Sequence, residues 1–240
     1  MAWKCGGSTN AELVGNLKNA KIIRTASVET AMSRVDRGAY YKGAGAYDDA
    51  PQRIGSNVTI SAPHMHAHAL ELLAPALAKP RARALDVGCG SGYLTAALGV
   101  MVGSEGVAVG IDHIEELVAN SHNAVAADDA RLLASSEPSG PVEFHVADGF
   151  DGWPDAAPYD VIHVGAAAPR MPAPLVAQLA PGGLLICPVG PDGGAQQLVQ
   201  LEKAAADGQI TQTDLMGVRY VPLTSKAQQL GQGNFGTRRM

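Results

Sequence analysis

The chain has 240 residues, of which 46% are hydrophobic and 17% are charged, a composition typical of a soluble globular protein. Its formal net charge of −5 argues against a nucleic-acid partner, because binding to phosphates requires clustered Lys and Arg. The longest apolar stretch, residues 94–102, is shorter than the roughly 18 residues of a membrane span, so no membrane association is expected. The three cysteines are widely spaced and lack metal-ligand spacing, and the polar N-terminus lacks the apolar core of a signal peptide. Both features predict a cytoplasmic protein.

Two short helices are predicted near the N-terminus, where apolar residues recur at helical spacing over residues 10–20 and 27–35. Ser27 is the expected N-cap of the second helix, because its hydroxyl can accept a bond from a free backbone N–H. Residues 37–54 are rich in Gly, Tyr and Asp, which favours an irregular connector.

A brief strand at residues 59–60 is expected to lead directly into a third helix. Ser61 is its predicted N-cap, and Pro63 falls in the first turn, where the missing N–H of proline does no harm. Pro80 marks the end of this helix.

From residue 81 onward, short apolar runs alternate with helical patterns. We expect strands at 84–87, 107–111, 142–146, 159–164 and 184–189, helices at 93–102, 114–133 and 174–179, and a turn at 181–183. This alternation predicts an α/β fold with a doubly wound, mainly parallel sheet and helices on both faces. The alternation of strands and helices ends there. Residues 197–201 and 209–213 flank Asp207-Gly208, which indicates an antiparallel hairpin. A last strand is expected at 217–221.

A glycine-rich loop after the first of these strands organises the sequence. Every second position after Asp86 is a glycine, namely Gly88, Gly90 and Gly92. Glycine allows both a sharp turn and close approach of a ligand. A dinucleotide fingerprint requires a third glycine where this chain has Tyr93. The G-x-G-x-G spacing, with an acid two residues upstream, instead favours an S-adenosylmethionine site.

Acidic residues also follow the next two strands, at the edge of the sheet where ligands bind. Asp112 is placed to accept bonds from both hydroxyls of a ribose, although it could alternatively cap the helix that follows it. Asp148 precedes Gly149 and suits an adenine amino group, but the pair could also form a simple turn.

Three histidines, His64, His66 and His68, raise the possibility of a metal site. On a helix, His64 and His68 share one face, whereas His66 points elsewhere, and neither a third ligand nor an H-E-x-x-H pattern is nearby. We therefore expect no metal and assign some of these histidines to the lining of a pocket. Ser61 lacks the G-x-S-x-G context of a serine nucleophile, which leaves it as a helix cap, a hydroxyl donor in a site, or both.

Several segments together resemble the protein-L-isoaspartate (D-aspartate) O-methyltransferase family of repair enzymes over nearly the whole chain. They are I-G at 54–55, T-I-S-A-P-H-M-H-A at 59–67, L-D-V-G-C-G-S-G at 85–92, G-I-D-H at 110–113, Y-D-V-I-H-V-G-A-A-A-P at 159–169, P-G-G at 181–183, P-V-G at 188–190 and V-P-L-T at 221–224. The glycine loop is shared with many methyltransferases, whereas the segment at 59–67 is characteristic of this family. Cys89 and Ala147 depart from the usual Ser and Gly, but both are small.

The resemblance implies a Rossmann-like class I methyltransferase that uses S-adenosylmethionine and has Ser61 as its active-site residue. With the glycine loop, the implied cofactor site comprises Val58, Thr59, Ile60, Ser61, His66, Asp86, Gly88, Gly90, Ser91, Asp112, His113, Ala147, Asp148, Thr224 and Gln229. We expect a single catalytic domain over residues 1–240, in which 1–80 form a helical, substrate-side extension and 81–240 form the cofactor-binding core.

The implied substrate is an isoaspartyl or D-aspartyl residue in a damaged peptide or protein, and the implied state is a monomer. The residues agree with this chemistry, because a carboxylate is already ionised at neutral pH and no convincing catalytic base is present. Three alternatives stay open: methylation of another carboxylic acid, a dinucleotide enzyme, and a non-catalytic adaptor that only binds the cofactor.

Overall fold

A computed structural model describes residues 5–136, 139–226 and 228–229. Its first part is mainly helical and contains α1 (Asn10–Asn19), α2 (Ala26–Arg34), α3 (Arg37–Tyr40), β1 (Gln52–Gly55), β2 (Val58–Ile60) and α4 (Pro63–Leu77). Helices α1 and α2 confirm the two helices that were predicted near the N-terminus. The cap of α2 was predicted wrongly, because the helix begins after Thr25 and Ser27 lies inside it. Thr25 does not cap the helix with its side chain and instead donates to the buried carboxylate of Glu71.

The segment expected to be an irregular connector contains two regular elements. Asp36 starts α3, because its side chain accepts the N–H of Gly38 at 2.9 Å. Strand β1 pairs antiparallel with β2, and Ser56 and Asn57 close the hairpin with φ angles of 46° and 60°. Elements of four residues are too short to show a hydrophobic period, so the sequence pattern could not reveal them.

Ser61 is not the N-cap of α4. That position belongs to Ala62, which makes no side-chain capping bond, and the expected Pro63 begins the helix. The carbonyl oxygen of Ser61 instead accepts a bond from the Arg37 guanidinium at 2.8 Å. The hydroxyl of Ser61 is therefore not needed for capping.

The second part of the chain builds the main sheet. It contains β3 (Arg83–Val87), α5 (Tyr93–Val102), β4 (Val107–Asp112), α6 (Glu115–Asp129), a 3₁₀ turn (Ala130–Leu132), β5 (Val142–Val146), a 3₁₀ turn (Pro154–Ala156), β6 (Tyr159–Val164), α7 (Ala173–Ala177), β7 (Leu179–Val189), β8 (Gln196–Lys203) and β9 (Ile210–Val218). The seven strands lie in the order β5-β4-β3-β6-β7-β8-β9. Neighbours from β5 to β7 are parallel, and β7-β8 and β8-β9 are antiparallel, which confirms the predicted fold class and the C-terminal hairpin.

Two local predictions in this part were wrong. The expected turn at 181–183 lies inside β7, where the pairing with β6 shifts from Tyr159–Leu179 to Val161–Leu184. Gly182, with φ of 77°, accommodates this bulge. The separate last strand expected at 217–221 does not form, because residues up to 218 belong to β9.

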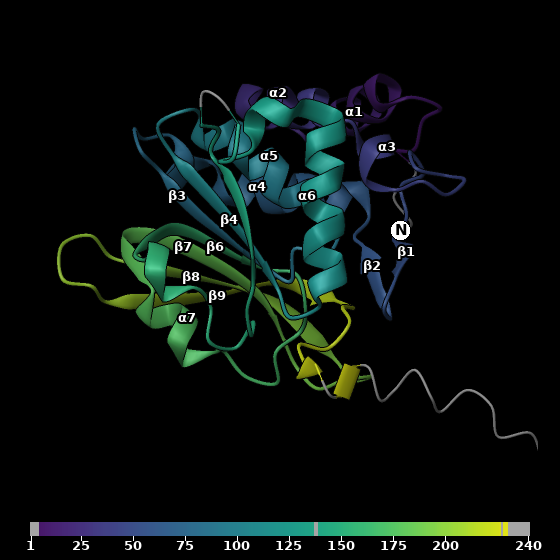
Figure 1. The fold of residues 1–240 in the computed structure, drawn as a ribbon. Coiled ribbons are helices and arrows are strands. Elements are labelled where there is room, and N and C mark those ends of the chain that lie inside the picture. Colours follow the sequence, from purple (N-terminus) through teal and green to yellow (C-terminus); the bar gives the residue numbers. More distant parts are fainter. Residues whose placement is uncertain (1–4, 137–138, 227, 230–240) are drawn as a thin grey trace, which may run out of the picture.

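Alternate residues of the central strands enter two different cores, as expected for a sheet covered on both faces. In β3, Ala84 joins the core beneath α1, α2, α4 and α5, whereas Leu85 and Val87 join the opposite core. Figure 1 shows the longer helices gathered above the sheet and α7 below it. The second face is therefore covered mainly by α7, Trp153 and loops rather than by long helices.

The strand order places a topological switch point between β3 and β6. The chain runs outward from β3 to β4 and β5, then returns to add β6 on the other side of β3. Ligands of such sheets bind beyond the carboxyl ends of the strands at this point. The N–H of Gly165, just after β6, donates to the carbonyl of Val87 at 2.8 Å and joins the two strand ends.

Candidate active site

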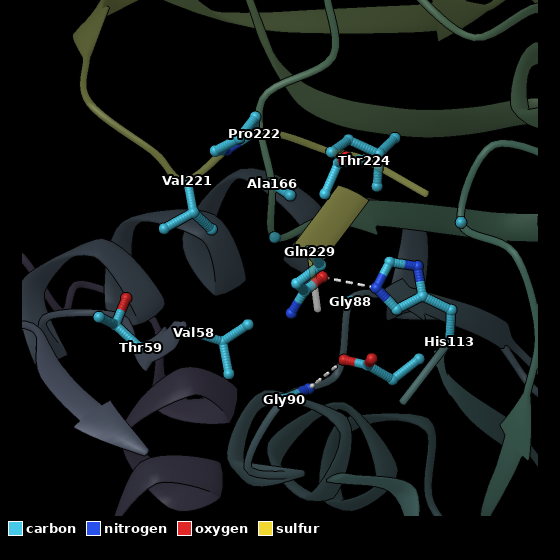
Figure 2. A pocket seen from close by; sticks show the side chains of 14 residues that line it. Val58, Thr59, Gly88, Gly90, His113, Ala166, Val221, Pro222, Thr224 and Gln229 are labelled. Carbon is cyan, nitrogen blue, oxygen red and sulfur yellow. Dashed lines mark hydrogen bonds between the residues drawn. The ribbon is translucent and has the colours of Figure 1, made fainter. Parts of the chain in front are cut away.

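A pocket opens at this switch point and gathers residues that are far apart in the sequence (Figure 2). Its lining comprises Val58, Thr59, Gly88, Gly90, Asp112, His113, Gly149, Gly165, Ala166, Val221, Pro222, Leu223, Thr224 and Gln229. The ends of β3, β4 and β6 therefore contribute, together with β2 and the segment after β9. The predicted residues Val58, Thr59, Gly88, Gly90, Asp112, His113, Thr224 and Gln229 are brought together here.

The glycine loop is shaped for a ligand that touches its backbone. Gly88 has φ of 76°, and a Cβ atom added there would meet no heavy atom within 4 Å. Because Gly88 lines the pocket, that Cβ would occupy open space at its wall. Gly92 is needed for a different reason, since a Cβ there would come within 2.8 Å of the Cβ of Ser121. The loop thus fits the close approach of a nucleoside cofactor.

Asp112 does not cap α6, because the N-cap position belongs to Ile114 and has no side-chain capping bond, and binding of a ribose by Asp112 stays a prediction. Its Oδ1 accepts the N–H of Ile114 at 3.0 Å, and its Oδ2 accepts the N–H of Gly90 at 3.3 Å. The side chain faces the pocket. Burial raises the pKa of Asp112 above its usual value, and the two N–H donors offset only part of this rise. A buried carboxylate that is held in place and has remaining lone pairs is suited to accept bonds from ribose hydroxyls.

Gln229 ties the end of the described chain to both sides of this pocket. Its Oε1 accepts a bond from Nε2 of His113 at 2.5 Å, and its Nε2 donates to the carbonyl of Ser56 at 2.9 Å. Figure 2 shows the side chain lying across the pocket toward His113. The contact with the β1–β2 turn was not predicted, because nothing in the sequence relates Ser56 to Gln229.

A second, smaller pocket of about 30 Å³ lies behind the glycine loop. It brings together other predicted residues, namely Ile60, Ser61, His66, Asp86 and Ser91, and adds His163. Asp86 is 1% exposed; its Oδ2 accepts from the Thr95 hydroxyl at 2.7 Å and its Oδ1 pairs with Nδ1 of His163 at 2.8 Å. Asp86 therefore orients His163, for which the sequence pattern predicts no role. The available signal was a histidine inside the otherwise apolar end of β6.

A groove of about 750 Å³ lies on the other side of Ser61. Its walls come from α4, the loop before β8 and the end of β9, with Ser61, Met65, Asp192, Met216 and Tyr220 among them. Thr59, Ser61 and Gly165 line both the groove and the small pocket. Ser61 therefore stands where the two cavities meet.

The three histidines of α4 have three different surroundings. Nδ1 of His64 lies 2.7 Å from Oδ1 of Asp49, His66 is buried beside Arg37, and His68 is half-buried. Burial, together with the charge of Arg37, holds the pKa of His66 well below its usual value. Within the described ranges, no cluster of three His, Cys, Asp or Glu side chains is arranged to hold a metal ion.

Ala147 and Asp148 lie beside the cofactor pocket, but the neighbouring Gly149 lines it. The carboxylate of Asp148 accepts the N–H of Phe150 at 2.9 Å, which is the turn that the sequence left as an alternative. Contact of Ala147 and Asp148 with an adenine ring stays a prediction.

The parallel sheet, the glycine loop, the acid at the end of β4 and the pocket at the switch point define a class I S-adenosylmethionine-dependent methyltransferase. Comparison with known proteins gives the particular family. The model of the Protein-L-isoaspartate(D-aspartate) O-methyltransferase family matches residues 8–228. The chain belongs to this family.

Relatives and solved structures agree with this placement. The chain is 51% identical over 222 residues to a protein-L-isoaspartate O-methyltransferase of Triticum aestivum, covering 92% of this chain and 94% of that protein. It is 49% identical to protein-L-isoaspartate O-methyltransferase 1 of Arabidopsis thaliana, with the same coverage. A Plasmodium falciparum protein assigned to the same activity, crystallised with S-adenosyl-L-homocysteine, is 33% identical and superposes with a TM-score of 0.80, covering 91% of this chain and 99% of that one.

Proposed function

We propose that this chain transfers a methyl group from S-adenosylmethionine to the free carboxylate of L-isoaspartyl and D-aspartyl residues in damaged peptides and proteins. The family and the cofactor class support the reaction. The single observation that carries the assignment of roles is the position of Ser61 between a pocket behind the glycine loop and a groove of about 750 Å³. We propose Ser61 as the residue that holds the reacting carboxylate at this junction.

The sulfonium of the bound cofactor supplies an activated methyl group. The chain has no need to remove a proton from the acceptor, because a carboxylate is ionised at neutral pH. Its residues therefore act by position: Asp112 and the glycine loop hold the nucleoside, and the Ser61 hydroxyl donates to the carboxylate at the mouth of the groove. Alignment of reactants in a cleft that excludes water is the source of rate in this account.

The product should be a carboxyl methyl ester, which distinguishes this function from N- and S-methylation. Attack by the neighbouring backbone nitrogen on the ester releases methanol and forms a succinimide, which reopens partly to normal aspartate. We therefore expect label transferred from methyl-labelled cofactor to an isoaspartyl peptide to become volatile in mild alkali. Label that stays on the peptide would contradict the proposal, and preferential labelling of small carboxylic acids would favour the first alternative.

We also propose that residues 1–80 and 81–240 work as one catalytic domain. Support comes from an apolar core shared by both parts, in which Leu13, Met32 and Leu73 pack in one cluster with Leu98 and Ile186. No helix among the described residues has the length and apolar character needed to cross a membrane.

A monomer in the cytoplasm is the state that we propose for this domain. Within the described ranges, the large hydrophobic side chains that are exposed are Val146, Ile210 and Met216. Such scattered side chains do not require a partner surface. The three cysteines are free and buried, which suits a reducing compartment.

A further inference from the structure

Arg37 buries a guanidinium beside the proposed active site. The residue is 0% exposed, and in the described part of the chain no carboxylate forms an ion pair with it. Its Nε donates to the carbonyl of Ala46 at 2.9 Å, its Nη2 donates to the carbonyl of Ser61 at 2.8 Å, and its Nη1 lies 3.4 Å from Nδ1 of His66. Burial lowers the pKa of Arg37 to about 10, so the group is charged at neutral pH. The charge of Asp49 raises the pKa of Arg37 without forming an ion pair with it, so burial of this guanidinium still costs folding free energy.

The contact with His66 determines where that imidazole carries its proton. A guanidinium has N–H donors and no acceptor, so the nitrogen that faces it must present a lone pair. Nδ1 of His66 is that nitrogen, and a proton placed there would point at a positive charge 3.4 Å away. A neutral imidazole carries one proton, which must then lie on Nε2.

His163, which lines the same small pocket, has the reverse arrangement. Its Nδ1 faces the carboxylate of Asp86, which only accepts, so Nδ1 carries a proton, and in the neutral imidazole Nε2 presents a lone pair. The two histidines therefore present opposite hydrogen-bonding groups to a ligand. In the pocket that both line with Ser61, His66 offers an N–H donor and neutral His163 offers an acceptor.

We infer that Arg37 is a positioning residue, which fixes His66 as an Nε2–H donor and holds the Ser61 peptide so that both residues can bind one carboxylate. This inference rests on the proposed function for its ligand. The carboxylate could belong to the isoaspartyl residue or to the methionyl end of the cofactor, and the chemistry of recognition is the same for both. Arg37 itself contacts neither, because it is 0% exposed and lines neither the small pocket nor the groove.

The tautomer can be measured without any substrate. In full-length protein labelled with ¹⁵N-histidine, two-bond nitrogen–proton correlations should show wild-type His66 with its proton on Nε2, assigned by comparison with His66→Gln. Arg37→Met should populate the Nδ1–H form, and Arg37→Lys should restore the Nε2–H form, because lysine is also a charged donor. Arg83→Met is the matched control, since Arg83 also donates to a backbone carbonyl but lies at the start of β3.

The same spectra provide a test against pH. The groups that face His66 are Arg37 on α3, His64 on its own helix, Tyr93 on α5 and His163 on β6. Besides burial, the charges of Arg37, His163 and His64 lower the pKa of His66, so removing Arg37 should raise the pH at which His66 takes up a second proton. Arg83→Met should leave that pH unchanged. An Nδ1–H tautomer in the wild type, or an unchanged tautomer and titration in Arg37→Met, would overturn the inference.

Kinetic measurements distinguish the two carboxylates. Loss of a bond to a charged group corresponds to roughly a ten- to hundredfold change. Arg37→Met should raise either the KM for an isoaspartyl peptide or the Kd for the cofactor by this factor, and the constant that changes identifies the carboxylate. Both constants unchanged in a folded variant with an altered tautomer would overturn the positioning role. If the wild type itself methylates no peptide, the proposed function fails, while the tautomer measurement still tests Arg37.

Discussion

At the scale of single residues, the proposed site consists of side chains whose bonds within the protein leave a defined atom for a ligand. Asp112 uses one lone pair of each oxygen for the N–H groups of Ile114 and Gly90, and it keeps the others toward the pocket. Ser61 has no capping bond to make, so its hydroxyl is available to a substrate. Asp86, in contrast, is committed to Thr95 and His163.

Replacing Asp112 by alanine should weaken binding of S-adenosylmethionine by about 1.5–3 kcal/mol, which is the range for a hydrogen bond to a charged group. This corresponds to a roughly ten- to hundredfold higher Kd in a calorimetric titration. Asp155→Ala, which removes the same charge from an exposed site, is the matched control. Unchanged affinity in a folded Asp112→Ala protein would leave Asp112 only its bonds to the backbone.

Replacing Ser61 by alanine should lower the rate of methylation while the melting temperature hardly changes. An N-cap serine would contribute about 1 kcal/mol to stability, but Ser61 is not the N-cap. Activity per folded molecule and thermal unfolding of Ser61→Ala should therefore separate, with Ser33→Ala on the exposed side of α2 as the control. Activity that falls only in proportion to the folded fraction would assign Ser61 a structural role.

At the scale of elements, the sequence patterns located the long helices and all the parallel strands, because their apolar periods are set by the core that they enter. They failed for α3 and the β1–β2 hairpin, where capping by Asp36 and left-handed residues at the turn, rather than periodicity, define the structure. The cofactor loop could be predicted because its glycines are local. His163 and Arg37 could not, because their partners come from distant parts of the chain.

The segment after β9 and the β1–β2 hairpin meet over the cofactor pocket through Gln229. Gln229→Ala removes two hydrogen bonds, and the loss of about 1 kcal/mol of net interaction should raise the Kd for the cofactor roughly fivefold. Because the side chain lies across the pocket, we expect the change in the dissociation rate. Stopped-flow measurement of cofactor release tests this, with Gln212→Ala on exposed β9 as the control. Equal release rates in both variants would show that Gln229 does not retain the cofactor.

At the scale of the whole molecule, the helical N-terminal part provides one wall of the active site and the sheet provides the other. Ser61 lies just before α4 and His66 lies in its first turn, whereas Gly88, Asp112 and His163 come from the ends of central strands. The apolar core beneath α1, α2 and α4 fixes the two parts together. The groove shares Thr59, Gly165, Val221 and Pro222 with the cofactor pocket and shares Ser61 with the small pocket. In the proposed function, a peptide in the groove meets the cofactor at this junction of the two parts.

The central claim is that this junction selects the displaced carboxylate of an isoaspartyl residue. The direct measurement is the initial rate of methyl transfer from labelled S-adenosylmethionine to two peptides of identical sequence, one with Asp and one with isoAsp. The account predicts rapid labelling of the isoAsp peptide, background labelling of the Asp peptide, and loss of the difference in Ser61→Ala. Equal labelling of the two peptides by the wild-type protein would contradict it.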